Sequence, residues 1–332
     1  MDSQTLTKLA AAVVAGGITL ELLGRRSRPS GSETNAAFVF VKPHACNDAV
    51  VERVRKSFAG WGITIKSEAK INGAVIDAES LIDNHYGAIA AKAMTTLPAD
   101  LHVPTKGQAA FEKAFGLTWA AALAAGQVYN AKQACEKLGI DGAGLDAKWA
   151  QTNRGVDCIK FGGGFYCASI DGIFIMNGFY MSMRGGYCKQ SANIHTFTVE
   201  WPAAKISWER FRGEVLGGTN PAEAAEGSLR KDIFDNWAEL GLAAEPNTGD
   251  NGMHASASPF EGLAERLNWC GATVASDIFG SALLAAGVAE ETILAGTQDP
   301  QATLDGKTGS FFDHLEDQDA ADNIANIAKM TL

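Results

Sequence analysis

One short stretch of the chain combines an imidazole with a hydroxyl, and a carboxylate follows about three helical turns later. The stretch 251–256 contains His254 and Ser256, and the apolar residues of 259–269 recur at the spacing of a helix that carries Glu265. Such a helix can fold back and bring its carboxylate near the imidazole. A carboxylate or hydroxyl bonded to one ring nitrogen fixes the tautomer and leaves the other nitrogen free to attack an electrophile. The spacing therefore predicts a histidine nucleophile with two orienting groups.

Groups suited to phosphate precede this stretch. Thr219 opens a Thr-Asn-Pro turn whose hydroxyl is free to meet a ligand, and Arg230 follows the flexible pair Gly227-Ser228. A guanidinium at such a place can fork onto phosphate oxygens. Each piece alone is common in loops, and a lone histidine is more often a satisfied core or surface residue than a catalyst. The pieces together favour a site that handles phosphate.

The composition argues against some kinds of partner and metal site. The chain has 332 residues, a net charge of -10 and a pI near 5.1. Because coating nucleic acid requires clustered Lys and Arg, we expect no nucleic-acid partner. The 6 cysteines include no C-x-x-C pair, so reduced and mostly buried thiols are expected instead of a zinc site. The run Gly162-Gly163-Gly164 lacks the G-x-x-x-x-G-K-[ST] pattern and indicates a hairpin or bulge.

The elements that must position these residues follow from the apolar periodicity. Strands are expected at 37–41, 63–71 and 195–201, and helices at 48–59, 77–94, 206–216 and 259–269. This order suits an α+β fold, an antiparallel ferredoxin-like sheet with helices on one face. Residues 95–154 are Ala-rich and helical in pattern, and 158–183 has strand-like runs with an Asp171-Gly172 hairpin turn. We therefore expect an inserted helical and hairpin subdomain at about 92–190.

The two ends of the chain form further units. Residues 1–35 are expected to be an apolar helix and a linker, 36–270 the main domain around its insertion, and 271–332 a helical C-terminal extension with an acidic patch at 313–322. Within 6–23, the clean apolar run is shorter than the roughly twenty residues that span a bilayer. Both a membrane or partner-binding helix and a packed helix remain open. The matching locations are the cytoplasm, or a mitochondrion or plastid if 6–23 acts as an anchor.

In order along the chain, these motifs resemble the nucleoside diphosphate kinase family. The resemblance covers roughly 38–90 and 195–270. It rests on Val41-Lys42-Pro43, His85-Tyr86, Leu216-Gly217-Gly218-Thr219-Asn220-Pro221, Gly227-Ser228-x-Arg230, and Asn251-x-x-His254-x-Ser256 with Glu265 and Trp269. Membership would imply a ping-pong cycle in which the γ-phosphoryl of a nucleoside triphosphate passes to His254 and then to a nucleoside diphosphate.

The resemblance also implies roles for individual residues. The catalytic set would be His254, Glu265, Ser256, Lys42 and Tyr86. The nucleotide-binding set would be Lys42, Arg212, Thr219, Arg230, Asn251 and an aromatic at Tyr180 or Phe179 that packs on the base. Mg²⁺ would be held by the nucleotide phosphates, with no metal ligand from the protein.

Three features depart from the family pattern. Gly213 replaces the arginine expected six residues before Thr219, and Arg212 lies one place earlier. Such a displacement rotates a helical side chain by about 100°, so Arg184 is an alternative source of the missing cation. His44 stands where the family has an acid. The stretch 231–250 is longer than usual beside the loop that builds the trimer contact in the family's hexamers. An oligomer or a larger complex is therefore expected, and the usual hexamer cannot be assumed.

Two other functions compete with an active kinase. One is a catalytically weak or inactive nucleotide-binding scaffold subunit of a larger assembly, membrane-associated if 6–23 is an anchor. The apolar N-terminus, the insertion, the extension and the displaced arginine favour it. The other is a hydrolase that uses His254 as a general base, which rests on the same residues. The kinase remains the leading hypothesis because it uses the nucleophile, both orienting groups and the phosphate-binding residues together.

Overall fold

A four-stranded antiparallel sheet carries the candidate nucleophile. The structure is a computed structural model that describes residues 33–162 and 164–332, so the expected N-terminal helix lies outside the described residues. The strands are β1 (Thr34–Val41), β2 (Thr64–Asn72), β7 (Asn193–Pro202) and β8 (Met253–Ala255), in the order β2-β7-β1-β8. The register pairs Phe40 of β1 with His254 of β8. His254 therefore lies beside the end of β1, just before Lys42.

Helices cover both faces of this sheet, so the expectation of helices on one face was wrong. The side chains of Val39 and Val41 pack with α2 (Asp48–Trp61), α12 (Leu229–Asp235) and the segment η3 (Phe211–Leu216). Phe38 and Phe40, which alternate with them, pack with α3 (Gly73–Ala78), α4 (Leu81–His85) and α13 (Pro259–Cys270). The reason is that β1 is apolar at successive positions and buries both of its faces.

The helix expected at 77–94 is divided into short pieces. α3 is followed by α4 after Ser80, whose φ of 53° lies in the left-handed region. Tyr86 then separates α4 from α5 (Gly87–Met94) with φ -101° and ψ 34°. This break places His85 and Tyr86 at a bend, where both side chains approach the sheet end that carries His254.

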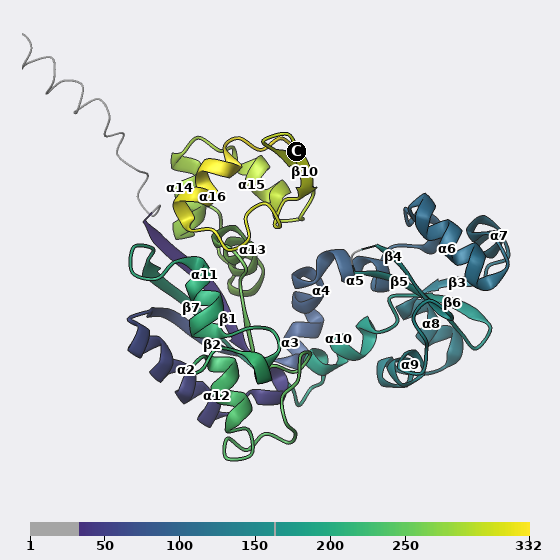
Figure 1. Ribbon diagram of the computed structural model, residues 1–332, viewed down its shortest axis with the longest axis horizontal. Coiled ribbons are helices and arrows are strands. Elements are labelled where there is room, and N and C mark those ends of the chain that lie inside the picture. The colour runs from purple at the N-terminus through teal and green to yellow at the C-terminus, as the bar shows by residue number, and fades with distance from the viewer. Residues whose placement is uncertain (1–32, 163) are drawn as a thin grey trace, which may run out of the picture.

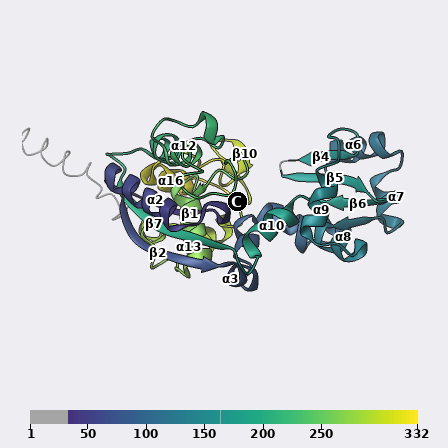
Figure 2. The ribbon, with the colours of Figure 1, turned by 90° about the horizontal axis from the view of Figure 1, so that it is seen from below.

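The insertion builds a second, mixed sheet. Its strands are β3 (Val128–Asn130), β4 (Cys158–Gly162), β5 (Phe165–Ile170) and β6 (Ile173–Met176), in the order β3-β6-β5-β4, with β3 and β6 parallel. Its helices are α6 (Thr105–Phe115), α7 (Trp119–Ala124), α8 (Ala131–Leu138) and α9 (Gly142–Trp149). The expected hairpin turn is confirmed, because Asp171 and Gly172 both have positive φ. Figures 1 and 2 show this lobe beside the main sheet, joined to it through α5 and α10 (Tyr180–Cys188).

The C-terminal extension packs on α13 (Figure 1). It contains α14 (Ile278–Ala285), α15 (Glu290–Gly296), α16 (Ala320–Ile327) and a hairpin of β9 (Gln301–Leu304) and β10 (Lys307–Ser310) that the sequence did not predict. Phe260 and Leu263 of α13 share one core with Phe279 and Phe311 of the extension. The fold is thus a mixed α+β architecture with one antiparallel and one mixed sheet. In the described part of the chain, no helix is both long and apolar enough to cross a membrane.

Candidate active site

His254 is held by a short chain of hydrogen bonds that ends in the main sheet. Its Nε2 lies 2.6 Å from Oε1 of Glu265, and the hydroxyl of Ser256 donates to Oε2 of Glu265 at 2.5 Å. The backbone N–H of Phe38 donates to that same hydroxyl at 2.9 Å. The ring of Phe40 stacks on the imidazole with centroids 4.7 Å apart. One ring nitrogen and one ring face are therefore fixed, and no described residue hydrogen-bonds to Nδ1.

The protonation of this pair follows from its burial. Burial, together with the charges of Lys42, Arg230 and Arg212, holds the pKa of His254 well below its usual value. Burial raises the pKa of Glu265 to about 7. Near neutral pH the imidazole is therefore neutral, and above about pH 7, where Glu265 is mostly ionised, the Nε2–H of the ring bonds to the carboxylate. The lone pair then remains on Nδ1, which is the state that a nucleophile requires. The orienting roles expected for Ser256 and Glu265 are consistent with these contacts.

His85 is a buried neighbour of this pair to which the sequence assigned no role. Its Nδ1 lies 3.5 Å from Oε1 of Glu265 and accepts a hydrogen bond from Nε1 of Trp269 at 3.3 Å. Burial and the nearby His254 lower the pKa of His85 to about 3, so the ring is neutral. Only the adjacent His85-Tyr86 pair in the sequence signalled its position, because the contact with Glu265 joins residues far apart in the chain.

The donor atoms of His85, His254 and Glu265 lie within 4.8 Å of one another, close enough to raise the question of a metal site. Two ligands of a tetrahedral zinc ion at bond lengths of 2.0–2.2 Å are about 3.3 Å apart. The His254 and Glu265 atoms are closer than that, at 2.6 Å, which is a charge-assisted hydrogen-bond distance. The trio therefore fits a hydrogen-bonded network better than a zinc site.

Lys42 and Arg230 bring positive charge to this network. Lys42 follows β1, and its Nζ donates to the carbonyl of Gly249 at 2.9 Å. Arg230, in the first turn of α12, donates to the carbonyls of Gly217 and Met253 at 2.8 and 2.9 Å. Burial and the charge of Arg230 lower the pKa of Lys42 to about 8, and burial and the charge of Arg212 lower that of Arg230 to about 10. Two partly desolvated cations thus act on the imidazole, and both were expected from the sequence.

The Thr-Asn-Pro turn is tied to the loop before β8. Nδ2 of Asn251 donates to the carbonyl of Thr219 at 3.1 Å, while its buried Oδ1 has no partner among the described residues. Thr219 is exposed, so its hydroxyl can contact a ligand. Gly217 has φ 94°, and a Cβ there would lie 2.4 Å from Oγ of Ser228, so only glycine fits between the turn and α12. The turn therefore offers a free hydroxyl beside an unused buried acceptor.

His44 ties the loop after β1 to the same segment. Its Nε2 accepts a hydrogen bond from the backbone N–H of Gly252 at 3.1 Å, and its Nδ1 lies 3.3 Å from Asp250. The histidine that departs from the family pattern therefore has a structural role in this chain.

The expected helix at 206–216 changes its winding at Arg212. A short turn, α11 (Trp208–Arg210), continues as the π-helical segment η3, in which the N–H of Gly217 donates to the carbonyl of Arg212 at 3.0 Å. A π-turn accommodates one more residue than an α-helical turn. Arg212 lies in this wider turn, and its charge acts on His254. The side chain of Arg212 is held by Glu316 and Asp317, both at 2.7 Å from Nη1.

Two expected residues are engaged elsewhere. Arg184 donates to both carboxylate oxygens of Asp83, at 2.9 and 3.0 Å, and pairs with Asp77 at 2.7 Å. Tyr180 is fully buried, and its hydroxyl donates to Asp83 at 2.7 Å. Neither side chain fits the role expected for it, as a substitute cation or as a base-stacking ring. The start of α10 belongs to the core of the insertion, where Phe179 also packs.

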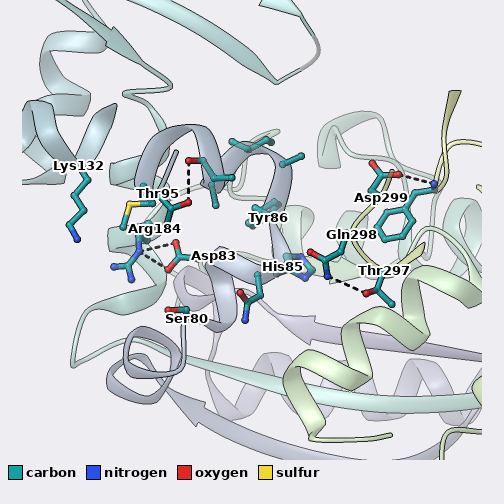
Figure 3. Close-up of a pocket in the computed structure, with 18 residues that line it drawn as sticks. Ser80, Asp83, His85, Tyr86, Thr95, Lys132, Arg184, Thr297, Gln298 and Asp299 are labelled. Carbon is teal, nitrogen blue, oxygen red and sulfur yellow. Dashed lines mark hydrogen bonds and ion pairs between the residues drawn. The ribbon is translucent and has the colours of Figure 1, made fainter. Parts of the chain in front are cut away.

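Two cavities meet near Tyr86. A cavity of about 630 Å³ is lined by Lys42, Tyr86, Asp250 and the second half of α10, including Met183 and Gly186. A larger one, of about 890 Å³, is lined by His85, Tyr86 and the Asp83–Arg184 pair on one side and by Thr297, Gln298 and Asp299 of the extension on the other (Figure 3). Only the smaller cavity contains a cation of the His254 network, so it is the better candidate for a nucleotide cleft.

Comparisons with known proteins give a distant likeness. No family model matches the chain, and no curated protein matches it. Solved structures that resemble it include a nucleoside diphosphate kinase from Encephalitozoon cuniculi, at 13% identity and TM-score 0.36, covering 73% of this chain and 92% of that one. An NDP kinase from Pyrobaculum aerophilum has 16% identity and a TM-score of 0.34, and the match covers 71% of this chain and 95% of that one. A nucleoside-diphosphate kinase from Borrelia burgdorferi, with bound vanadate and ADP, has 15% identity and a TM-score of 0.32, and the match covers 71% of this chain and 87% of that one. Likeness at this level carries no argument about activity, which must come from the site itself.

Proposed function

We propose that this protein is a phosphotransferase of the nucleoside diphosphate kinase type that works through a phosphohistidine on His254. The observation that carries the proposal is the environment of the imidazole. Nε2 is bonded to buried Glu265, Nδ1 has no described partner, and three cations lower the pKa of the ring. A neutral, oriented imidazole among cations is suited to attack a phosphorus atom that carries negative charge.

The arrangement of the chain supports the same proposal. The antiparallel strand order β2-β7-β1-β8 is the one expected of a ferredoxin-like unit. We propose that residues 36–270 form this unit, interrupted at about 92–190 by the insertion and followed by the extension at 271–332. The motifs that resemble the family lie on this unit, and its sheet brings Lys42, Arg230 and His254 together.

The proposed reaction has two half-reactions that mirror each other. The lone pair of Nδ1 forms a bond to the γ-phosphorus while the bond from that phosphorus to the β,γ-bridging oxygen breaks, and the nucleoside diphosphate leaves. Positive charge that develops on the ring is stabilised by Glu265 at Nε2. A terminal oxygen of a second nucleoside diphosphate then attacks the phosphorus, the N–P bond breaks, and its electron pair returns to Nδ1.

The nucleotide would bind with its phosphates between the cations. Lys42, Thr219, Arg230 and Arg212 would contact phosphate oxygens, and the free Oδ1 of Asn251 would accept a hydrogen bond from a ribose hydroxyl. The base would extend into the smaller cavity, along α10. Tyr180, which is buried in the core of the insertion, would not stack on the base there.

Magnesium would accompany the nucleotide and neutralise charge on the transferring group. Three carboxylates around the proposed site are already engaged within the described residues: Glu265 bonds to the imidazole and to Ser256, while Glu316 and Asp317 bond to Arg212. This donor set fits an ion carried on the phosphate oxygens better than one held by protein ligands.

The experiment is a labelling and discharge assay. Purified protein is mixed with γ-labelled ATP and Mg²⁺, and the label is tested for acid lability, alkali stability and discharge by GDP. The proposal expects one label per chain, discharged by GDP and absent from His254→Gln. A folded wild-type protein that takes no label would overturn it, and tight nucleotide binding in that protein would favour the scaffold function instead.

A further inference from the structure

The extension places two carboxylates on a cation of the proposed active site. We call Glu316 and Asp317 the acidic clamp. Each carboxylate lies 2.7 Å from Nη1 of Arg212, whose charge acts on His254. Arg212 is 30% exposed at its side chain, and the two acids are each 47% exposed, so both partners border solvent. The contact joins segments more than a hundred residues apart.

The acidic clamp is anchored by the fold on both sides. The backbone N–H of Asp317 donates to the carbonyl of Ala257 at 3.0 Å, directly after the nucleophile's strand. Leu315, the preceding neighbour of the clamp, is buried, and Nδ2 of Asn323 donates to its carbonyl at 3.0 Å. Asp317 has a φ of 59°, a conformation that few residues other than glycine adopt and that Asp and Asn tolerate best. The clamp therefore has a defined position beside the site.

The acidic clamp changes the charge that a nucleotide meets. One guanidinium faces two carboxylates, so this group of three carries a net charge of -1 where the phosphates of a nucleotide would approach. Burial lowers the pKa of Arg212, but the hydrogen bonds that its guanidinium donates to Glu316 and Asp317 raise it overall, so the guanidinium stays charged and bound to the two acids. Carboxylate and phosphate oxygens compete for the same planar fork of donors.

The influence of the clamp extends toward the nucleophile. Burial and the neighbouring Glu265 raise the pKa of Glu261 to about 8, and the charges of Arg212 and Glu316 also act on it. Glu261 is one helical turn before Glu265 on α13. The acidic clamp is therefore on the same side of the site as the carboxylate that orients His254.

We propose that the acidic clamp is an intramolecular mimic of the substrate's phosphate, which occupies Arg212 and must release it before a nucleotide binds productively. This inference rests on the proposed function, because it concerns the same phosphate site. It gives the extension a regulatory role: any partner or modification that draws the clamp away would raise the affinity for nucleotide.

The test compares two charge-matched double variants. Glu316→Gln with Asp317→Asn removes the clamp's charge and keeps the backbone, since Asn tolerates the conformation of Asp317. Glu290→Gln with Glu291→Gln removes the same charge from exposed positions of α15 in the same extension. Equilibrium binding of Mg·ADP is measured for both at moderate salt. The proposal expects the clamp variant to bind about tenfold more tightly than wild type and the α15 variant to bind within about twofold of it.

Removing Arg212 provides the second arm. In an Arg212→Gln background the clamp substitutions should no longer change the affinity for ADP, because the cation for which they compete is gone. Unchanged or weaker binding by the clamp variant would overturn the proposal, as would an equal gain in the absence of Arg212. A clamp variant that fails to fold is replaced by Glu316→Gln alone, for which a smaller gain of the same sign is expected. Failure of the proposed function is distinguishable, since it would leave His254 unlabelled in every variant whatever their affinities.

Discussion

Replacing Glu265 by Gln should slow phosphorylation of His254 without destabilising the protein. The carboxylate accepts the Nε2 proton at 2.6 Å and stabilises the charge that forms on the ring during attack. Hydrogen bonds to charged groups contribute about 1.5–3 kcal/mol. At about 1.4 kcal/mol per decade, the first half-reaction should slow by roughly 10- to 150-fold. Gln retains an acceptor oxygen, so the ring orientation should persist.

The same substitution, which slows the reaction, should preserve or raise the free energy of unfolding. The pKa of Glu265 is about 7 in the folded state against 4.5 for an ordinary Glu, so between these pH values the folded state holds a proton that the unfolded state has lost. The wild type therefore loses stability as pH rises from 4.5 through about 7, by up to about 3 kcal/mol. The Gln variant lacks this loss and should be at least as stable as wild type at pH 8.

The assay combines single-turnover labelling by γ-labelled ATP with urea unfolding, both at pH 8. Glu261→Gln is the matched control, since it removes another, partly buried carboxylate with a raised pKa from the same helix without touching the imidazole. We expect the control to phosphorylate within about threefold of wild type, well short of the effect at Glu265. A Glu265→Gln variant that is folded and phosphorylates within twofold of wild type would refute the reasoning, because the hydrogen bond would then contribute nothing to the transition state.

Three further predictions concern the pocket around His254. Because Glu265 must be ionised and Lys42 must be protonated, kcat/KM should rise with pH through about 7 and fall above about 8. If the rise through pH 7 persists in Glu265→Gln, then Glu265 is not the group whose ionisation causes it. Gly186→Leu should fill the smaller cavity and abolish labelling by ATP, while labelling by the small donor phosphoramidate should persist. Gly185→Leu, at a neighbouring α10 position that does not line this cavity, should leave labelling by both donors intact. If the two variants reduce labelling by ATP equally, this cavity is not the nucleotide cleft. Asn251→Ala should lower kcat/KM for ATP about tenfold and for 2′,3′-dideoxy-ATP much less, since only ATP has the hydroxyls for Oδ1; equal losses would remove the ribose contact.

The apolar periodicity predicted the elements that carry the site. The expected strands at 37–41, 63–71 and 195–201 correspond to β1, β2 and β7, and the helix at 259–269 corresponds to α13. The patterns of β1, β7 and α13 are strong because β1 and β7 are central strands of the main sheet and α13 packs against it. The expected helix at 77–94 instead divides at Ser80 and Tyr86, whose backbone angles interrupt it without a proline to announce the breaks.

The hairpin β9–β10 was missed because its strands are short and mostly polar, although Asp305-Gly306 is a hairpin-turn dipeptide. A four-residue polar strand has too little alternation to stand out from a loop.

For the site, local spacing was enough to join His254, Ser256 and Glu265, since all three belong to one strand–helix unit. The position of Arg212 could not be predicted, because the π-helical turn in which it lies leaves no mark on the apolar pattern. Its pairing with Glu316 and Asp317 depends on how the extension docks, which is set by the shared core of Phe260 and Phe311.

Tyr180 was misplaced for a related reason: the start of α10 packs into the insertion's own core, and sequence order alone does not show which core takes it.

The ring nitrogen that carries the phosphoryl group tests the central claim most directly. Wild-type protein is phosphorylated with ATP and Mg²⁺, denatured in alkali, and the phosphohistidine isomer is identified by ³¹P NMR. Because Nε2 is bonded to Glu265, the account predicts a single Nδ1-phosphohistidine that GDP discharges before denaturation and that His254→Gln lacks. A phosphoryl group on Nε2, or on a residue other than His254, would contradict it.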